Sequence, residues 1–165
     1  MRSKPSKAKN GVSLVLALYQ PDIPQNTGTL LRLGACLGVP VHVIGPVGFR
    51  LDDPALKRAG MDYLERAALT RHSSFEAFDR WLELEQRRLL LMTTKSSRPY
   101  CDIAFEQNDV LLMGRESVGV PEVIHQRADE RLVIPMIDGN RSLNVAVATA
   151  MVLGEALRQT RWSLA

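Results

Sequence analysis

Three short segments combine glycine with polar side chains that can bind and orient a ligand. The first is Asn26-Thr27-Gly28, with Arg32 one helical turn later. The second runs from Gly114 to Gly119 (GRESVG), and the third from Asp138 to Asn144 (DGNRSLN). In the last two segments a short apolar run stops and a helix is expected to start, so backbone amides and polar side chains meet at each corner. Ligands of open α/β sheets bind beyond the carboxyl ends of strands, so we expect both corners to share one pocket.

The sequence lacks the usual nucleotide-binding and metal-binding patterns. Neither GxGxxG nor GxxxxGK[ST] follows the first apolar run, which excludes an ordinary dinucleotide-binding or P-loop protein. Cys36 and Cys101 are far apart, and the three histidines form no HxxxH or HxxE pattern. We therefore expect no metal site.

The length and charge of the chain limit its organisation and its partners. The chain has 165 residues and a formal net charge of +3, which fits one domain and permits a polyanionic partner. We expect a basic, flexible tail at residues 1–12, either solvated or in contact with phosphates, and a single domain at residues 13–165. The longest apolar run, 145–154, is far shorter than the roughly 20 residues of a membrane span. Together with the isolated cysteines, this predicts a cytoplasmic protein without membrane attachment.

Apolar runs and helix signals alternate along the domain. Continuously apolar runs predict buried parallel strands, while Gly, Pro and capping residues mark helix ends. The expected strands are 13–18, 41–44, 66–69, 88–94, 109–113 and 131–134. The expected helices are 25–37, a short one that starts at 52–54, one capped at 73–76 that runs to 85, 117–127 and 143–161. This alternation predicts an α/β fold, with a mostly parallel sheet covered by helices on both faces.

The final helix also predicts an assembly. From Val145 to Leu157 it is apolar nearly all round, with small residues at Ala146, Ala150 and Gly154. A helix that is apolar on every face must be buried on every face, and a second subunit is the simplest cover in a small domain. We therefore expect a homodimer that buries the first and last helices.

Taken in this order, the three polar segments resemble the three motifs of the SPOUT superfamily of RNA methyltransferases, in its ribose 2′-O-methylating, SpoU-like branch. The length is similar to that of the minimal tRNA enzymes of the TrmL (YibK-like) group, and the resemblance extends from Leu14 to Arg158. It implies S-adenosyl-L-methionine as methyl donor, S-adenosyl-L-homocysteine as product, tRNA as partner and a homodimer. It also implies a C-terminal trefoil knot (SPOUT fold), which pattern alone would not predict because knots are nearly absent from proteins.

The resemblance assigns roles to particular residues. It implies that the cofactor is bound by Met92, Thr93, Gly114, Ile134, Met136, Ser142 and Leu143. It implies catalytic roles for Arg32, Glu116, Ser142 and Asn144. It implies substrate contacts from Asn26, Arg32, Arg115 and Arg141. Because a guanidinium stays charged, Arg32 is better suited to clamp a phosphate or stabilise a forming alkoxide than to act as a base.

Each of these residue types also has an ordinary structural role. Met92, Ile134 and Leu143 could be plain core residues, because an apolar pocket wall looks like core in a sequence. Asn144 could cap the final helix. Glu116 could hydrogen-bond Arg32, orient the ribose, or only complement a helix dipole.

The resemblance favours ribose 2′-O-methylation of tRNA, with the wobble cytidine or uridine of the anticodon as the expected target. One alternative is a ribosomal RNA methyltransferase of the same SpoU-like group, although such enzymes usually carry an additional RNA-binding domain. The other is a non-catalytic RNA-binding dimer of the same fold. The presence of Arg32, Glu116, Ser142 and Asn144 argues against loss of catalysis.

Overall fold

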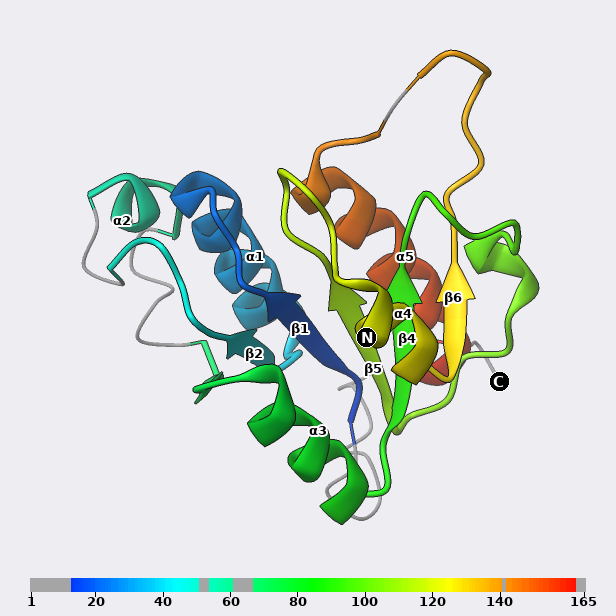
Figure 1. Cartoon of the computed structure of the whole chain (residues 1–165), viewed down its shortest axis with the longest axis horizontal. Coiled ribbons are helices and arrows are strands. Elements are labelled where there is room, and N and C mark those ends of the chain that lie inside the picture. Colours follow the sequence, from blue (N-terminus) through cyan, green and yellow to red (C-terminus); the bar gives the residue numbers. More distant parts are fainter. Residues whose placement is uncertain (1–12, 51–53, 61–66, 141, 163–165) are drawn as a thin grey trace, which may run out of the picture.

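The computed structural model describes residues 13–50, 54–60, 67–140 and 142–162 of the protein. These residues form one sheet in the order β3-β2-β1-β5-β4-β6, in which every neighbouring pair is parallel (Figure 1). The strands are β1 (Val15–Tyr19), β2 (Val41–Ile44), β3 (Leu69–His72), β4 (Arg88–Met92), β5 (Asp109–Met113) and β6 (Glu130–Leu132). The helices are α1 (Pro24–Leu37), α2 (Pro54–Gly60), α3 (Phe75–Leu84), α4 (Glu122–Arg127) and α5 (Val145–Thr160), with a 3-10 turn η2 (Tyr100–Asp102). The prediction of an α/β fold with a parallel sheet is confirmed.

Helices cover the sheet on both faces. Alternate residues of β1 point to opposite faces, so Leu16 and Leu18 belong to one core while Val15 and Ala17 belong to the other. Apolar residues of α1 and α5 complete the first core, and those of α3 and α4 complete the second (Figure 1). The central strands are therefore buried on both faces, which is why their sequences are continuously apolar.

Three helix ends follow signals in the sequence. α1 ends at Gly38, whose φ of 65° lies in the left-handed region that favours glycine. α3 begins after Ser74, whose Oγ accepts a hydrogen bond from the amide of Ala77 at 3.2 Å. α5 begins after Asn144, whose Oδ1 accepts hydrogen bonds from two backbone amides of the first turn. Asn144 thus has the capping role that its residue type suggested, and its Nδ2 is left for other contacts.

α4 is shorter than the sequence predicted. We expected it to begin at residue 117, but it begins at Glu122. Arg115 and Gly119 instead close a turn through mutual backbone hydrogen bonds of 3.0 and 2.8 Å. Gly119 has a φ of 69°, which interrupts a right-handed helix, and Pro121 then caps α4. The polar residues 115–118 therefore lie on a tight turn rather than on a helix.

The expected strand at 66–69 was also misplaced. β3 is Leu69–His72, in parallel register with β2, and residue 66 lies outside the described residues. β3 is an edge strand with exposed Thr70 and Arg71, so it carries no apolar run by which the sequence could mark it. The other strands begin and end within two residues of their expected positions. The start of α2 at 52–53 lies outside the described residues.

The segments around β6 follow an unusual spatial order. β6 pairs with β4 on one side. On its other side, Val133 exchanges two backbone hydrogen bonds of 2.9 Å with Arg98 and Tyr100. Residues 130–133 therefore lie between β4 and the segment 98–100, which follows β4 after a short loop (Figure 1).

Candidate active site

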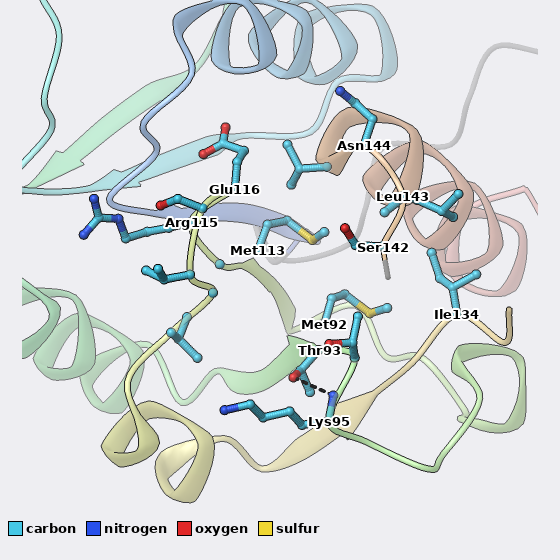
Figure 2. Close-up of a pocket in the computed structure, with 18 of the residues that line it drawn as sticks. Met92, Thr93, Lys95, Met113, Arg115, Glu116, Ile134, Ser142, Leu143 and Asn144 are labelled. Atoms are coloured by element: carbon cyan, nitrogen blue, oxygen red, sulfur yellow. Dashed lines mark hydrogen bonds between the residues drawn. The ribbon is translucent and has the colours of Figure 1, made fainter. Parts of the chain in front are cut away.

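A cavity of about 650 Å³ opens at the carboxyl ends of β4, β5 and β6 (Figure 2). Residues from the segments 92–95, 113–120, 133–136 and 142–145 line it. Ile23, Asn26, His125 and Ala148 complete the lining. The two polar corners that we expected to share one pocket do share it, because their parallel strands end at the same edge of the sheet.

One wall of the cavity is largely apolar. Met113 and Ile134 are buried, Met92 and Met136 are half-buried, and Leu143 is exposed at the start of α5. Figure 2 shows Met92 and Met113 pointing into the space that faces Ser142. All seven residues for which the resemblance implied cofactor contacts line this cavity: Met92, Thr93, Gly114, Ile134, Met136, Ser142 and Leu143. Their contact with a cofactor stays a prediction.

Gly114 is required by the shape of this wall. A Cβ atom at this position would lie 2.9 Å from the Cα and carbonyl carbon of Gly119 and 3.2 Å from Cγ1 of Val120. The closest approach to Gly114 is that of the chain's own turn. Gly114 therefore permits the turn 115–119 to fold back against the end of β5.

The opposite side of the cavity carries a chain of polar side chains. Glu116 Oε2 accepts a hydrogen bond from the amide of Asp22 at 3.0 Å, and its Oε1 accepts one from Asn26 Nδ2 at 3.4 Å. Asn26 Oδ1 in turn accepts from Asn144 Nδ2 at 3.1 Å. These bonds connect the turn after β5, the start of α1 and the start of α5, which are far apart in sequence. The orientation of Glu116 is therefore set by three parts of the fold.

Asp22 contacts the same turn through its side chain. Its Oδ2 accepts a hydrogen bond from Ser117 Oγ and lies 3.7 Å from Arg115 Nη2. A hydrogen bond with the Glu116 side chain lowers the pKa of Asp22, and the hydrogen bond from Ser117 and the charge of Arg115 lower it further. Burial raises the pKa of Glu116, and the carboxyl group of Asp22 raises it as well. The pKa values of the two carboxyl groups are therefore shifted apart, that of Asp22 downward and that of Glu116 upward.

The basic residues with implied substrate contacts lie in different places. Arg115 lines the cavity but Figure 2 shows it pointing away from Met92 and Ser142. Arg32 is exposed on α1 and is not among the residues that line the cavity. Glu116 forms hydrogen bonds with Asp22 and Asn26. Arg141 lies outside the described residues.

Two members of the polar network were missed by sequence reasoning. Asp22 and Ser117 are ordinary loop residues in the sequence, and 95 positions separate the two atoms that hydrogen-bond. The only local signal was that Asp22 follows the end of β1, the edge at which ligands bind. Lys95, which we did not place in the pocket, also lines the cavity.

The site combines an apolar slot with amide and carboxyl groups at one end. Such a lining suits a ligand that has a flat apolar part and polar groups that require orientation. Among the described residues, no cluster of His, Cys, Asp or Glu is large enough to hold a metal ion. No helix in the described part of the chain has both the length and the apolar composition needed to cross a membrane.

Known proteins of similar sequence agree on one family. A model of the SpoU rRNA Methylase family matches residues 13–154. A protein of Beijerinckia indica named tRNA (cytidine(34)-2'-O)-methyltransferase is 62% identical over 145 residues, which are 88% of this chain and 91% of that protein. A protein of Escherichia coli with the same name is 41% identical over 149 residues, which are 88% of this chain and 93% of that protein.

Solved structures of similar fold agree with the sequence matches. One, described as "Structural insights into the 2-OH methylation of C/U34 on tRNA", has a TM-score of 0.85 and 43% identity, and covers 90% of this chain and 96% of that chain. The SpoU methyltransferase AviRb from Streptomyces viridochromogenes, in complex with the cofactor AdoMet, has a TM-score of 0.82 at 27% identity. That match covers 89% of this chain but 57% of the longer AviRb chain.

Proposed function

Because the chain belongs to the SpoU rRNA methylase family, we propose that it is a tRNA ribose 2′-O-methyltransferase that uses S-adenosyl-L-methionine. The proposed substrate is supported by relatives that are 57% and 62% identical over most of the chain and are named tRNA (cytidine(34)-2'-O)-methyltransferase. The proposed target is therefore the wobble nucleotide, cytidine or uridine 34. The natural setting for this reaction is the cytoplasm, which agrees with the two exposed free cysteines.

The cavity fits S-adenosyl-L-methionine in its chemistry. The apolar wall of Met92, Ile134 and Leu143 suits an adenine ring, and Thr93 and Ser142 offer hydroxyl groups to the polar parts. When bound, this cofactor supplies an already activated methyl group. The work left to the protein is to bind the donor, orient the ribose and manage one proton. A solved relative at 27% identity contains AdoMet, which supports the same donor for this chain.

The polar network performs the orienting step. S-adenosyl-L-methionine would supply the methyl group to the ribose 2′-oxygen and leave as S-adenosyl-L-homocysteine, and the hydroxyl proton would pass to solvent water. Glu116 accepts a hydrogen bond from the 2′-hydroxyl, because its oxygens have free lone pairs beside those used by Asp22 and Asn26. Asn144 fixes Asn26 and also caps α5, so a rigid helix end supports this side of the site. Ser142 orients the donor from the facing side.

The RNA is held by basic residues around the cavity. Arg32 stays charged and clamps a phosphate of the target nucleotide, for which its planar guanidinium is suited. Arg115 and Lys95 stand at the cavity and add phosphate contacts, and Arg141 has the same proposed role. Asn26 contacts the ribose from the start of α1. Replacing Arg32 with Lys should leave cofactor affinity nearly intact but lower the rate of methyl transfer by orders of magnitude.

A homodimer completes the proposed enzyme. α5 leaves Val147 and Met151 exposed at 51% and 41%, and Ile23 beside the start of α1 is 41% exposed. α1 packs next to α5, so these apolar side chains belong to neighbouring elements that a second subunit can cover. Arg32 lies on the exposed side of α1, so it would lie at or near this interface. Light scattering should report a dimer at micromolar concentration, and Met151→Lys should weaken it.

We also propose that the C-terminal segment is knotted. The support is that residues 130–133 lie between β4 and the segment 98–100, which follows β4 in sequence. The chain then continues into α5 on one face of the sheet (Figure 1). A trefoil knot results if residues 130–145 pass through the loop formed by residues 93–108. The fold match to SpoU methyltransferases supports the same arrangement.

The proposed function is tested by mapping the product. Purified protein, S-adenosyl-L-methionine and unmodified tRNA transcripts are incubated, and ribose methylation is located by mass spectrometry. The expected result is one methyl group on the 2′-oxygen of nucleotide 34, and Glu116→Gln should abolish most of it. Methylation of ribosomal RNA fragments in place of tRNA would favour the ribosomal alternative. A cofactor that neither binds nor raises the melting temperature would leave only the RNA-binding alternative.

A further inference from the structure

The loop between β1 and α1 carries a carboxylate that contacts three consecutive residues of the turn after β5. We propose that Asp22 is a positioning residue of the active site, which holds the turn 115–119 in place and fixes Glu116 toward Asn26. This inference rests on the proposed methyl transfer, because it concerns how Glu116 meets the ribose. None of the three sequence motifs includes Asp22.

The contacts of Asp22 divide between backbone and side chain. Its amide donates to Glu116 Oε2 at 3.0 Å, which fixes one oxygen of that carboxyl group. Its Oδ2 accepts from Ser117 Oγ and lies 3.7 Å from Arg115 Nη2, so it holds the residues on both sides of Glu116. Without these contacts the turn would keep its own closure between Arg115 and Gly119 and the hydrogen bond from Asn26 to Glu116.

The charges around this pair come from few groups. Among the residues that the structure describes, the charged contacts of Glu116 and its turn come from Asp22 and Arg115, whereas α1 and α5 contribute the neutral amides of Asn26 and Asn144. A negative charge on Asp22 therefore acts directly on Glu116. It makes ionisation of Glu116 less favourable, in the direction that burial already acts.

The carboxylate of Asp109 has a purely structural role and provides a comparison for Asp22. Asp109, at the start of β5, is fully buried and accepts hydrogen bonds of 2.6 and 2.8 Å from Arg88 and of 2.8 Å from the amide of Glu106. Asp22 is different, because its Oδ1 and the Nε of Arg115 are buried without a hydrogen-bond partner among the described residues. Buried polar atoms without hydrogen-bond partners stabilise a fold poorly, and these two atoms lie beside the cavity. The arrangement is better explained by the position it gives to Glu116.

The test uses the nearly isosteric Asp22→Asn variant, which keeps an acceptor for Ser117 but removes the charge. Glu116 is followed by ¹³C-detected NMR titration of its carboxyl carbon, with the signal identified by its absence in Glu116→Gln. We expect Glu116 to titrate at lower pH in Asp22→Asn than in the wild type, since the neighbouring negative charge is gone. This readout needs no RNA, so it remains valid if tRNA proves not to be the substrate.

The kinetic part of the test measures single-turnover methylation of tRNA across pH. In Asp22→Asn the rate should fall about tenfold to a hundredfold, the cost of small misplacement in an active site, while cofactor affinity changes less than about threefold. One limb of the pH–rate profile is the one that disappears in Glu116→Gln. In Asp22→Asn this limb should move to lower pH. Ser117→Ala is the matched control, because it removes one contact of Asp22 and keeps the charge. It should lower the rate less and leave that limb nearly in place.

Several results would overturn the inference. An unchanged Glu116 titration in Asp22→Asn, or a full methylation rate, would show that Asp22 does not act through Glu116. A lower rate with an unmoved pH limb would show that its role is only structural. Asp22→Ser is the second variant if Asp22→Asn does not fold, with the same expected shifts. A wild-type protein inactive on tRNA would contradict the proposed function alone, and the NMR result would still decide the role of Asp22.

Discussion

Two pairs of titratable side chains lie close together in this structure, in different surroundings. His42 of β2 and His72 of β3 approach within 2.9 Å, between His42 Nδ1 and His72 Nε2. The rings of Trp81 and Phe78 of α3 pack against them, with centroid distances of 4.3 Å to His42 and 5.3 Å to His72. Burial lowers the pKa of both histidines, that of His42 to about 4, and the pair is enclosed by packed rings.

The other pair is Asp22 and Glu116, of which Glu116 lines the cavity. Here one pKa is lowered and the other is raised, and the partners of Glu116 come from a loop and from α1. A perturbed pKa therefore occurs both in packed core and at the candidate site. What separates the two pairs is access to a cavity with convergent polar groups, so geometry rather than pKa marks the functional pair.

The largest expected effect tests this distinction directly. Glu116→Gln should lower the rate of methyl transfer about a hundredfold or more, because it removes the carboxyl group that we propose contacts the reacting hydroxyl. Its melting temperature should stay close to that of the wild type. His72→Gln is the matched change in the other pair, and it should lower the melting temperature while activity per folded molecule is retained. Single-turnover assays and thermal melts of both variants provide the measurement. If Glu116→Gln lowered the melting temperature and His72→Gln lowered the activity, the functional and structural roles would be assigned to the wrong pairs.

The second prediction concerns pH and stability. Unfolded histidine has the ordinary pKa of 6.5, while folded His42, which is 5% exposed, has a pKa of about 4. The folded state therefore favours the neutral ring, and its contribution to stability is present above pH 6.5 and is lost as pH falls to about 4. The loss amounts to at most about 3–4 kcal/mol for His42, and His72 adds to it in the same direction.

Urea unfolding between pH 7 and pH 4 measures this effect. His42→Gln should be less stable at pH 7 and should show a flatter dependence of unfolding free energy on pH. A wild-type stability that does not fall through this window would mean that the histidine pair is protonated as readily in the folded state as in the unfolded one.

Most of the fold could be predicted from the sequence, because its strands and helix ends are determined by residues that are close together in the chain. Continuously apolar runs identified β1, β2, β4 and β5, and Ser74 and Asn144 marked helix starts through their caps. It failed at β3, an edge strand with little apolar signal, and at residues 117–121, where Gly119 and Pro121 end a turn rather than begin a helix. Despite these two errors, every expected strand is present in the sheet.

The site was only partly predictable, because its polar bonds are long-range. Gly114, Glu116, Ser142 and Asn144 came from the order of three motifs that resemble a known family, and the structure places them around one cavity. Asp22 could not be found, since its partners lie more than ninety positions away. The close return of Gly119 to Gly114 could not be predicted either, because only the structure places the turn against the end of β5.

The third prediction concerns Gly114, which lies between the apolar wall of the cavity and the turn that carries Glu116. Gly114→Ala would place a Cβ 2.9 Å from the backbone of Gly119, so the turn that carries Glu116 must shift. We expect a loss of about 1–3 kcal/mol in unfolding free energy and a weaker affinity for S-adenosyl-L-methionine by about tenfold. Gly48→Ala is the control, since nothing lies within 4 Å of the added Cβ and the residue has no left-handed φ. Calorimetry should find its cofactor affinity unchanged, and equal behaviour of the two variants would mean that the turn is free to move.

The smallest expected effect concerns Arg115, which either serves the Asp22 pair or contacts RNA. Its side chain is 37% exposed and its Nη2 lies 3.7 Å from Asp22 Oδ2, so the ion pair should stabilise the fold by less than about 1 kcal/mol. If Arg115 contacts a phosphate, Arg115→Gln should weaken tRNA binding a few-fold and reduce the slope of log affinity against log salt by about one. Arg127→Gln is the control, because Arg127 pairs with Asp79 away from the cavity and should change stability but not the salt slope. Binding titrations from low to moderate salt measure both variants. An unchanged slope in Arg115→Gln would assign Arg115 wholly to the Asp22 pair, because the loss of a phosphate contact must alter the number of counterions released.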